Sequence, residues 1–182
     1  MRPLLLLLLS LTSALAAAAP DPTPYPFTPS PKGLQVQMVD DLLELGVHHA
    51  GINLTLNGLL SPAKEAKPGQ PTASADGFTF VINEAYAKSL DRQIKPLSDK
   101  GVVVTAILIT YRSPNERIRT LTVHPQADAT KGTTMAANTV TPEGRACYKA
   151  LTAFIAHRWS SADATHGRVW GWVISNEVNS HH

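Results

Sequence analysis

Cysteine is almost absent from this chain, and so is any strong excess of one charge. The single cysteine, Cys147, excludes a disulfide within the chain, and its helical surroundings predict a small core residue. Lysine and arginine number 16 against 14 acidic residues, which argues against a nucleic-acid partner or an anionic membrane surface. Zinc-type Cys/His spacings and glycine-rich phosphate loops are also missing. We therefore expect no metal site and no bound cofactor.

The N-terminus has the pattern of a secretory signal peptide. Arg2 gives a short positive region, residues 4–9 are all leucine, and residues 16–18 are all alanine. The apolar run is shorter than the ~20 residues that a membrane-spanning helix needs, which argues against a stable membrane anchor. We predict a signal peptide over residues 1–18 and export to the periplasm or out of the cell.

Prolines dominate the next segment, with six between residues 20 and 31. Proline restricts φ and removes a backbone donor, so this density favours an extended linker. We predict a linker over residues 19–31 and a folded part over residues 32–182.

Helical and strand patterns then alternate along the chain. Apolar spacing predicts a short helix that ends at Gly46, a longer helix that begins at Asn83, and another that begins at Thr141. Three apolar runs are typical of strands, and they cover residues 47–56, 102–109 and 169–177. This alternation predicts an α/β fold with a parallel sheet and crossover helices. The pattern fits an open doubly wound sheet and part of a closed barrel equally well, and both place sites at the carboxyl ends of the strands.

Two polar stretches interrupt the alternation. Residues 62–75 read as an insertion, followed by a short extra strand over residues 78–82. Residues 110–139 form a longer polar stretch, and loops of this length are usually functional or disordered. Because this stretch follows a buried strand, it lies where active-site loops lie in α/β proteins.

The last predicted strand ends in a carboxylate. Side-chain alternation puts Gly171, Val173, Ser175 and Glu177 on one face, and the two strand tryptophans on the other. A closed barrel explains this division, because small residues fit the interior and tryptophans pack against outer helices. A glutamate at the mouth of such a barrel, among apolar groups, gains the raised pKa that a general acid requires.

Polar residues follow the other predicted strands. Asn53 offers amide hydrogen bonds at the same edge, or is a solvated strand end. Tyr111 and Arg112, just past the second buried strand, are placed to stack on or bond a sugar, or belong to a solvated loop. His181 and His182 point apart on a strand and supply only two ligands, so they do not indicate a metal site.

At this point the sequence resembles known families. Ser175-Asn176-Glu177, after Trp-Gly-Trp-Val-Ile, is similar to the Asn-Glu motif of retaining glycosidases with (β/α)₈ barrels, glycoside hydrolase clan A. Three longer stretches resemble a bacterial family named domain of unknown function 5722. They cover residues 32–54, 124–144 and 174–179.

The resemblance implies a partial (β/α)₈ TIM barrel, about its first four β/α units, over residues 32–182. It implies that Glu177 is the acid/base and that Asn176 bonds the sugar hydroxyl beside the reacting carbon; Asn53, Asn179 and Tyr111 are further substrate-binding candidates. Ser175 and Val178 replace the glycine and proline common around the motif. A retaining mechanism also needs a second carboxylate about 5 Å away. The clan takes it from the seventh strand, so no nucleophile is assigned here.

We therefore expect a fragment of a secreted glycoside hydrolase-like protein that acts on a β-linked polysaccharide or oligosaccharide. By itself the fragment is not expected to be catalytic. One alternative is a non-catalytic carbohydrate-binding or scaffold barrel in which Glu177 is structural. Another is an open α/β domain with an unrelated ligand. The sequence indicates no oligomeric state.

Overall fold

A computed structural model describes residues 23–128 and 130–175 of the protein. The predicted signal peptide therefore lies outside the described residues, together with the first part of the predicted linker. Asn176, Glu177 and Asn179 also lie outside them.

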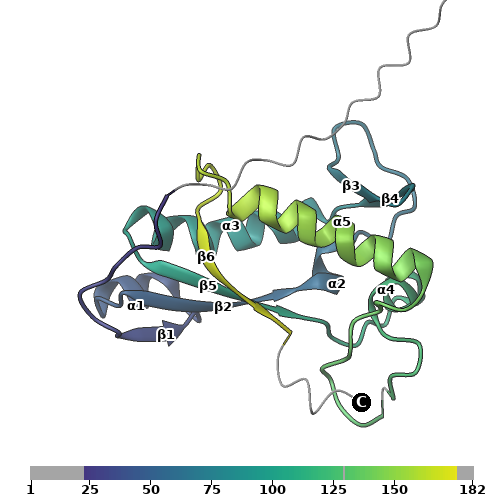
Figure 1. The fold of residues 1–182 in the computed structure, drawn as a ribbon, viewed down its shortest axis with the longest axis horizontal. Helices are drawn as coiled ribbons and strands as arrows, with labels where there is room; N and C mark the ends of the chain where they lie inside the picture. The colour runs from purple at the N-terminus through teal and green to yellow at the C-terminus, as the bar shows by residue number, and fades with distance from the viewer. Residues whose placement is uncertain (1–22, 129, 176–182) are drawn as a thin grey trace, which may run out of the picture.

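A four-stranded parallel sheet forms the centre of the fold (Figure 1). Its spatial order is also its order along the chain, so the chain crosses the sheet in one direction. Every neighbouring pair is parallel. The strands are β1 (Gly33–Gln35), β2 (His49–Thr55), β5 (Val103–Ile109) and β6 (Val169–Ile174). The prediction of an α/β fold with a parallel sheet is confirmed, although β1 was not predicted.

Helices connect these strands and share one hydrophobic core with the sheet. The crossover helices are α1 (Val39–Glu44), α3 (Glu84–Asp99) and α5 (Pro142–Trp159). The core-facing strand residues alternate with their neighbours along β2 and β5, and they are Ala50, Ile52, Leu54, Val104, Ala106 and Leu108. Right-handed crossovers that step in one direction bring their helices to the same face of the sheet, which accounts for this single core.

Local signals set the helix ends as predicted. The Asn83 side chain accepts a hydrogen bond from the Tyr86 backbone N at 3.2 Å, and the Thr141 hydroxyl accepts one from the Gly144 N at 3.1 Å. Gly46 follows α1 with φ 62°. These caps satisfy backbone groups that have no partner within the helix.

A two-stranded antiparallel hairpin corrects the predicted insertion. Residues 72–75 form a strand instead of an irregular segment, and they pair with the predicted extra strand. Asp76 and Gly77 form the turn with φ 50° and 82°, the left-handed pair that a tight hairpin requires. The strands are β3 (Thr72–Ala75) and β4 (Phe78–Val81).

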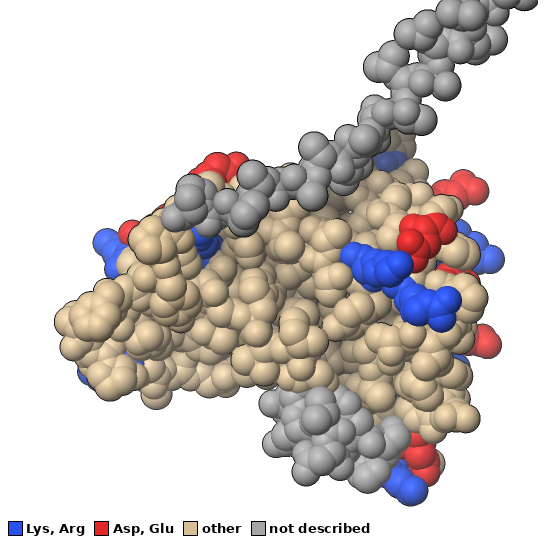
Figure 2. Space-filling view, viewed as in Figure 1, with Lys and Arg blue, Asp and Glu red and all other residues tan. Residues whose placement is uncertain are grey.

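The hairpin lies beside α5 (Figure 1). An exposed ion pair joins the two, with 2.7 Å between Lys149 Nζ and Asp76 Oδ2. Positive and negative side chains also lie side by side over a largely uncharged surface in Figure 2. This face therefore carries no large patch of one sign.

The stretch over residues 110–139 is folded and is not a structureless loop. It contains α4 (Glu116–Thr122), where the Asn115 side chain accepts a hydrogen bond from the Ile118 N at 3.0 Å. Isolated bridges join Tyr111 to Thr134 and Val123 to Ala137. A shorter helix, α2 (Leu56–Leu59), follows β2 directly.

A bulge in β6 corrects the predicted alternation. Val169 pairs with Val104, but the next residue of β5 pairs with Gly171, so Trp170 is the extra residue. Trp172 packs against the core as predicted and donates from Nε1 to the Ser160 hydroxyl at 3.0 Å. Trp170 instead contacts Tyr25 and Arg168. The strand ends at Ile174 because Ser175 has φ 72°, which lies outside the extended region.

An ion-pair cluster joins α3 to the end of α5. Asp91 Oδ1 accepts hydrogen bonds from Arg158 Nε and Trp159 Nε1, each at 3.0 Å. Asp91 Oδ2 lies 2.5 Å from Arg158 Nη2 and 3.3 Å from His166 Nδ1. The carboxylate is 17% exposed, so little solvent competes for these bonds. Trp159 itself is fully buried in the core.

Across residues 23–128 and 130–175, no helix combines the length and the apolar character that crossing a membrane requires.

Replacing Asp91 tests how much this cluster contributes to the free energy of unfolding. We expect Asp91→Asn to lower the free energy of unfolding by about 2–4 kcal/mol, because it leaves a mostly buried guanidinium without its counter-ion. The matched control is Asp99→Asn, which breaks an exposed i,i+4 pair with Lys95 and is expected to cost at most about 0.5 kcal/mol. Urea unfolding measures both, and equal losses would contradict the interpretation.

Candidate functional site at the strand carboxyl ends

The sheet face opposite the core carries a row of small and polar side chains, next to the apolar Ile107 and Val173. Register places Gln35, Gly51, Thr105 and Gly171 side by side across the four strands. A Cβ on Gly51 would lie 2.9 Å from Gln35 Oε1, and a Cβ on Gly171 would lie 2.8 Å from Thr105 Oγ1. Neighbouring side chains therefore lie over both glycines on this face. Val173, on the same face, is 44% exposed.

Asn53 lies on this face toward the carboxyl end of β2 and is exposed. Gln35 Nε2 donates a hydrogen bond to Asn53 Oδ1 at 3.2 Å. The pair presents amide groups at the edge where both predicted architectures place their sites, and Asn53 Nδ2 takes no part in this bond. Gln35 was not predicted, because only strand pairing brings it beside Asn53.

Hydrogen bonds fix the end of β2 itself. The Tyr86 hydroxyl accepts from the backbone N and from the hydroxyl of Thr55, each at 2.9 Å. Two residues further on, Asn57 Oδ1 accepts from the Tyr111 backbone N at 3.1 Å. The Tyr86 bonds connect β2 to α3, and the Asn57 bond connects α2 to the segment after β5.

Tyr111 lies in a different part of this edge from Asn53. It lines a hollow of about 580 Å³ whose other residues also come from the segment after β5. Asn53 is not among them. The structure thus places both predicted sugar contacts at strand carboxyl ends but does not bring them together.

Asn138 holds the segment after β5 against the start of α5. Its side chain is buried, and Nδ2 donates to the Thr120 carbonyl at 2.8 Å and to the Thr141 hydroxyl at 2.9 Å. Oδ1 accepts from the Thr141 backbone N at 3.2 Å. A Cβ on Gly144 would lie 2.3 Å from Asn138 Cγ, so only glycine fits there. The stretch over residues 138–144 belongs to the family resemblance described above, but the sequence did not indicate that Asn138 packs against Gly144.

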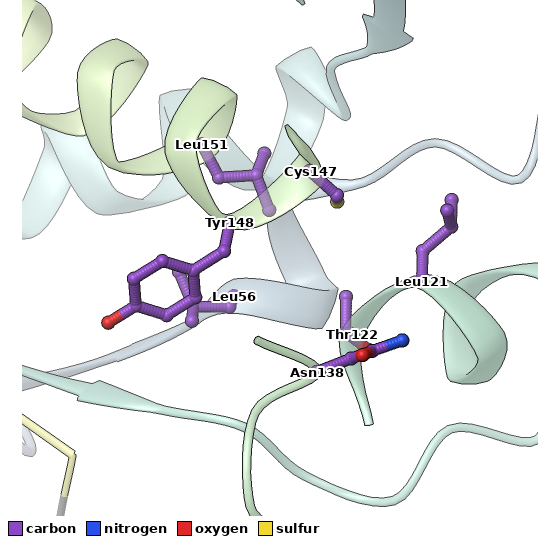
Figure 3. Close-up of a pocket in the computed structure, with 7 residues that line it drawn as sticks. All are labelled: Leu56, Leu121, Thr122, Asn138, Cys147, Tyr148 and Leu151. Atoms are coloured by element: carbon purple, nitrogen blue, oxygen red, sulfur yellow. The ribbon is translucent and has the colours of Figure 1, made fainter. Parts of the chain in front are cut away.

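A small cavity lies beneath this segment (Figure 3). Its volume of about 10 Å³ admits roughly one water-sized group, which is too little for a sugar. Cys147 and Leu151 line it from α5, and the Tyr148 hydroxyl points away from the thiol in Figure 3. Burial raises the pKa of the Cys147 thiol to about 12. Its prediction as a core residue is confirmed, and such a thiol is a poor nucleophile.

The predicted acid/base Glu177 and the sugar-binding candidates Asn176 and Asn179 lie outside the described residues. Within residues 23–128 and 130–175, no group of three or more His, Cys, Asp or Glu side chains is arranged to hold a metal ion. The described strand ends contribute amides, hydroxyls and arginines, which are groups that bind polar ligands.

These features define an α/β protein with a parallel four-stranded sheet and polar groups at the strand carboxyl ends. The chain belongs to a family of unknown function, DUF5722, whose family model matches residues 24–182. The predicted membership of this family is confirmed. A search of curated proteins and a search of solved structures both find no match.

The buried thiol provides a test of packing at the site. The folded state favours the protonated thiol. The stability that folding gains from this protonated thiol is therefore fully present below about pH 9, and it is lost as the pH rises toward 12. At about pH 8 we expect Ellman's reagent to label native Cys147 at least ~10²-fold more slowly than the urea-unfolded chain. Cys147→Ala is the blank. Rapid labelling of the native chain would show that α5 does not cover the thiol.

Proposed function

We propose that the protein is glycosidase-like and acts on a β-linked polysaccharide or oligosaccharide at the carboxyl ends of its strands, with Glu177 as the acid/base. The observation that carries the proposal is the position of the motif along the chain. β6 ends at Ile174, beside the end of β5, and Asn176-Glu177 follows after the single residue Ser175. Active sites of parallel α/β folds form at this edge.

The proposal includes a barrel. We infer that the sheet is part of a (β/α)₈ arrangement, because its strand order runs in one direction and its helices share one core. A doubly wound sheet reverses direction at a switch point and carries helices on both faces. Gly51 and Gly171 on the opposite face suit the crowded interior of a barrel.

In the proposed chemistry, Glu177 donates a proton to the oxygen that leaves the anomeric carbon. Asn176 and the Gln35–Asn53 amide pair bond sugar hydroxyls, and Tyr111 stacks on a neighbouring sugar. A retaining reaction needs a second carboxylate about 5 Å from the first. The strand-end groups named here do not include one, so the chain supplies the acid and an added anion can stand in for the nucleophile.

The proposal includes export of the protein. Arg2, the leucine run over residues 4–9 and the alanines over residues 16–18 support secretion through a signal peptide.

Azide rescue tests the assignment of Glu177. The purified chain is incubated with a panel of 4-nitrophenyl β-glycosides and sodium azide. Azide attacks the anomeric carbon as the C–O bond breaks, and the Glu177 proton passes to the leaving oxygen. We expect azide-dependent release of nitrophenol and an α-glycosyl azide, because one displacement inverts the configuration.

The Glu177→Gln variant separates acid catalysis from binding. With 4-nitrophenyl glycosides we expect its azide-dependent rate to fall by about 10²-fold or more. With 2,4-dinitrophenyl glycosides, whose leaving group needs little protonation, the loss is smaller. Glu143→Gln, at the exposed start of α5, is the matched control. Oligosaccharide binding without azide-dependent release would favour the non-catalytic alternative, and equal rates for the two variants would exclude Glu177 as the acid.

A further inference from the structure

The segment between β5 and α5 forms a cleft of which the proposed function uses only Tyr111. Two hollows, of about 350 and 580 Å³, share Arg112 and Arg119 as lining residues. His124 and Thr141 line the first hollow, and Tyr111 lines the second. We call this surface the arginine cleft. It lies just past the carboxyl end of β5, beside the edge where the strands present their polar groups.

Among the described residues that line the cleft, the charged side chains are Arg112 and Arg119. Both arginines are exposed, and none of the described residues that line the two hollows is Asp or Glu. Arg119 Nη1 donates to the Ser113 carbonyl at 3.3 Å, which uses one of the five N–H donors of the guanidinium. The His124 Nδ1 accepts from the Gln126 backbone N at 3.2 Å, so the neutral ring carries its proton on Nε2 and is a donor there.

The cleft rests on a buried floor. Met135 and Val123 are buried beneath it, and Asn138 ties the same segment to Thr141, the N-cap of α5. The backbone N of Arg112 donates to the Thr133 carbonyl at 3.0 Å. The backbone at Arg112 is therefore held in place, and the Arg119 bond to Ser113 orients one guanidinium.

We propose that the arginine cleft binds the anionic groups of an acidic oligosaccharide, either uronate carboxylates or sulfate esters. The planar guanidinium forms paired hydrogen bonds with carboxylate and sulfate oxygens, and Tyr111 offers a ring for the sugar. The cleft is a local feature, since the whole chain has a net charge of only +2. This inference rests on the proposed function, because it assigns the class of glycan that the same strand-end region holds.

Binding of three tetrasaccharides tests the assignment. Calorimetry measures the affinity of the full chain for a β-linked tetramannuronate, a sulfated β-linked galactan tetramer and the neutral, β-linked cellotetraose. We expect at least one acidic tetramer to bind about tenfold or more tightly than cellotetraose, and to weaken as salt rises from about 0.05 to about 0.5 M. The comparison of the two acidic tetramers identifies the anion.

Variants locate the binding. Arg119→Gln and Arg112→Gln are each expected to weaken the acidic tetramer about tenfold, and Arg119→Lys, which keeps the charge but loses the fork, by an intermediate amount. Arg92→Gln, an exposed position on α3, makes the same charge change away from the cleft and is expected to leave the affinity unchanged. Thermal melting confirms that each variant is folded.

Three outcomes overturn the inference: acidic and neutral tetramers that bind equally, an acidic tetramer that Arg92→Gln weakens as much as Arg119→Gln, or no binding of either acidic tetramer. The proposed acid/base role of Glu177 is tested separately, because the azide assay uses neutral aryl glycosides. A chain that passes one test and fails the other therefore shows which proposal is wrong.

Discussion

The fold depends on burying one face of a parallel sheet beneath helices that all arrive from the same side. Each crossover carries the chain one strand further in the same direction, and α1, α3 and α5 share a single core with the sheet. Strands β2 and β5 place alternate residues, such as Leu54 and Ala106, in that core. On the opposite face, β2 and β6 keep the small or polar residues Gly51, Asn53 and Gly171, whereas β5 contributes the apolar Ile107 beside Asn53.

This one-sided arrangement decides where polar chemistry can occur. The ends of β2 and β5 lie side by side at one edge of the sheet. Beyond them the strands no longer pair, and the residues there carry amide, hydroxyl and guanidinium side chains. Hydrogen bonds of two side chains hold the segments at this edge together. Tyr86 bonds the end of β2 from α3, and Asn138 binds the segment after β5 to the start of α5. The same contacts that complete the fold therefore shape the strand-end groups and the arginine cleft.

Elements with strong local signals were predictable. The β-branched run of β5, the Asn83 cap and the Thr141-Pro142 helix start each depend on neighbours in sequence, and each is confirmed. Asp76-Gly77 was also a local hairpin signal, but the polar residues before it concealed the first strand. The bulge at Trp170 was not predictable, because it depends on which β5 residue pairs with Gly171.

The candidate site was predictable only in part. Strand parity placed Asn53 at a carboxyl end, and the length of the segment after β5 indicated a functional region. The Gln35–Asn53 bond and the Asn138–Thr120 bond each join residues 18 positions apart, and the shared position of Arg112 and Arg119 depends on how the segment between them folds. No single-sequence pattern encodes such contacts. The roles proposed for Asn176, Glu177 and Asn179 remain predictions.

Cysteine labelling tests the one-sided sheet most directly. In a Cys147→Ala background, single cysteines replace Val173 on the face away from the helices and Ala106 on the core face. The account predicts that the cysteine at position 173 reacts with a thiol reagent at least ~10²-fold faster than the one at position 106, because only the first meets solvent. Equal protection of both positions would contradict it, since both faces of the sheet would then be covered.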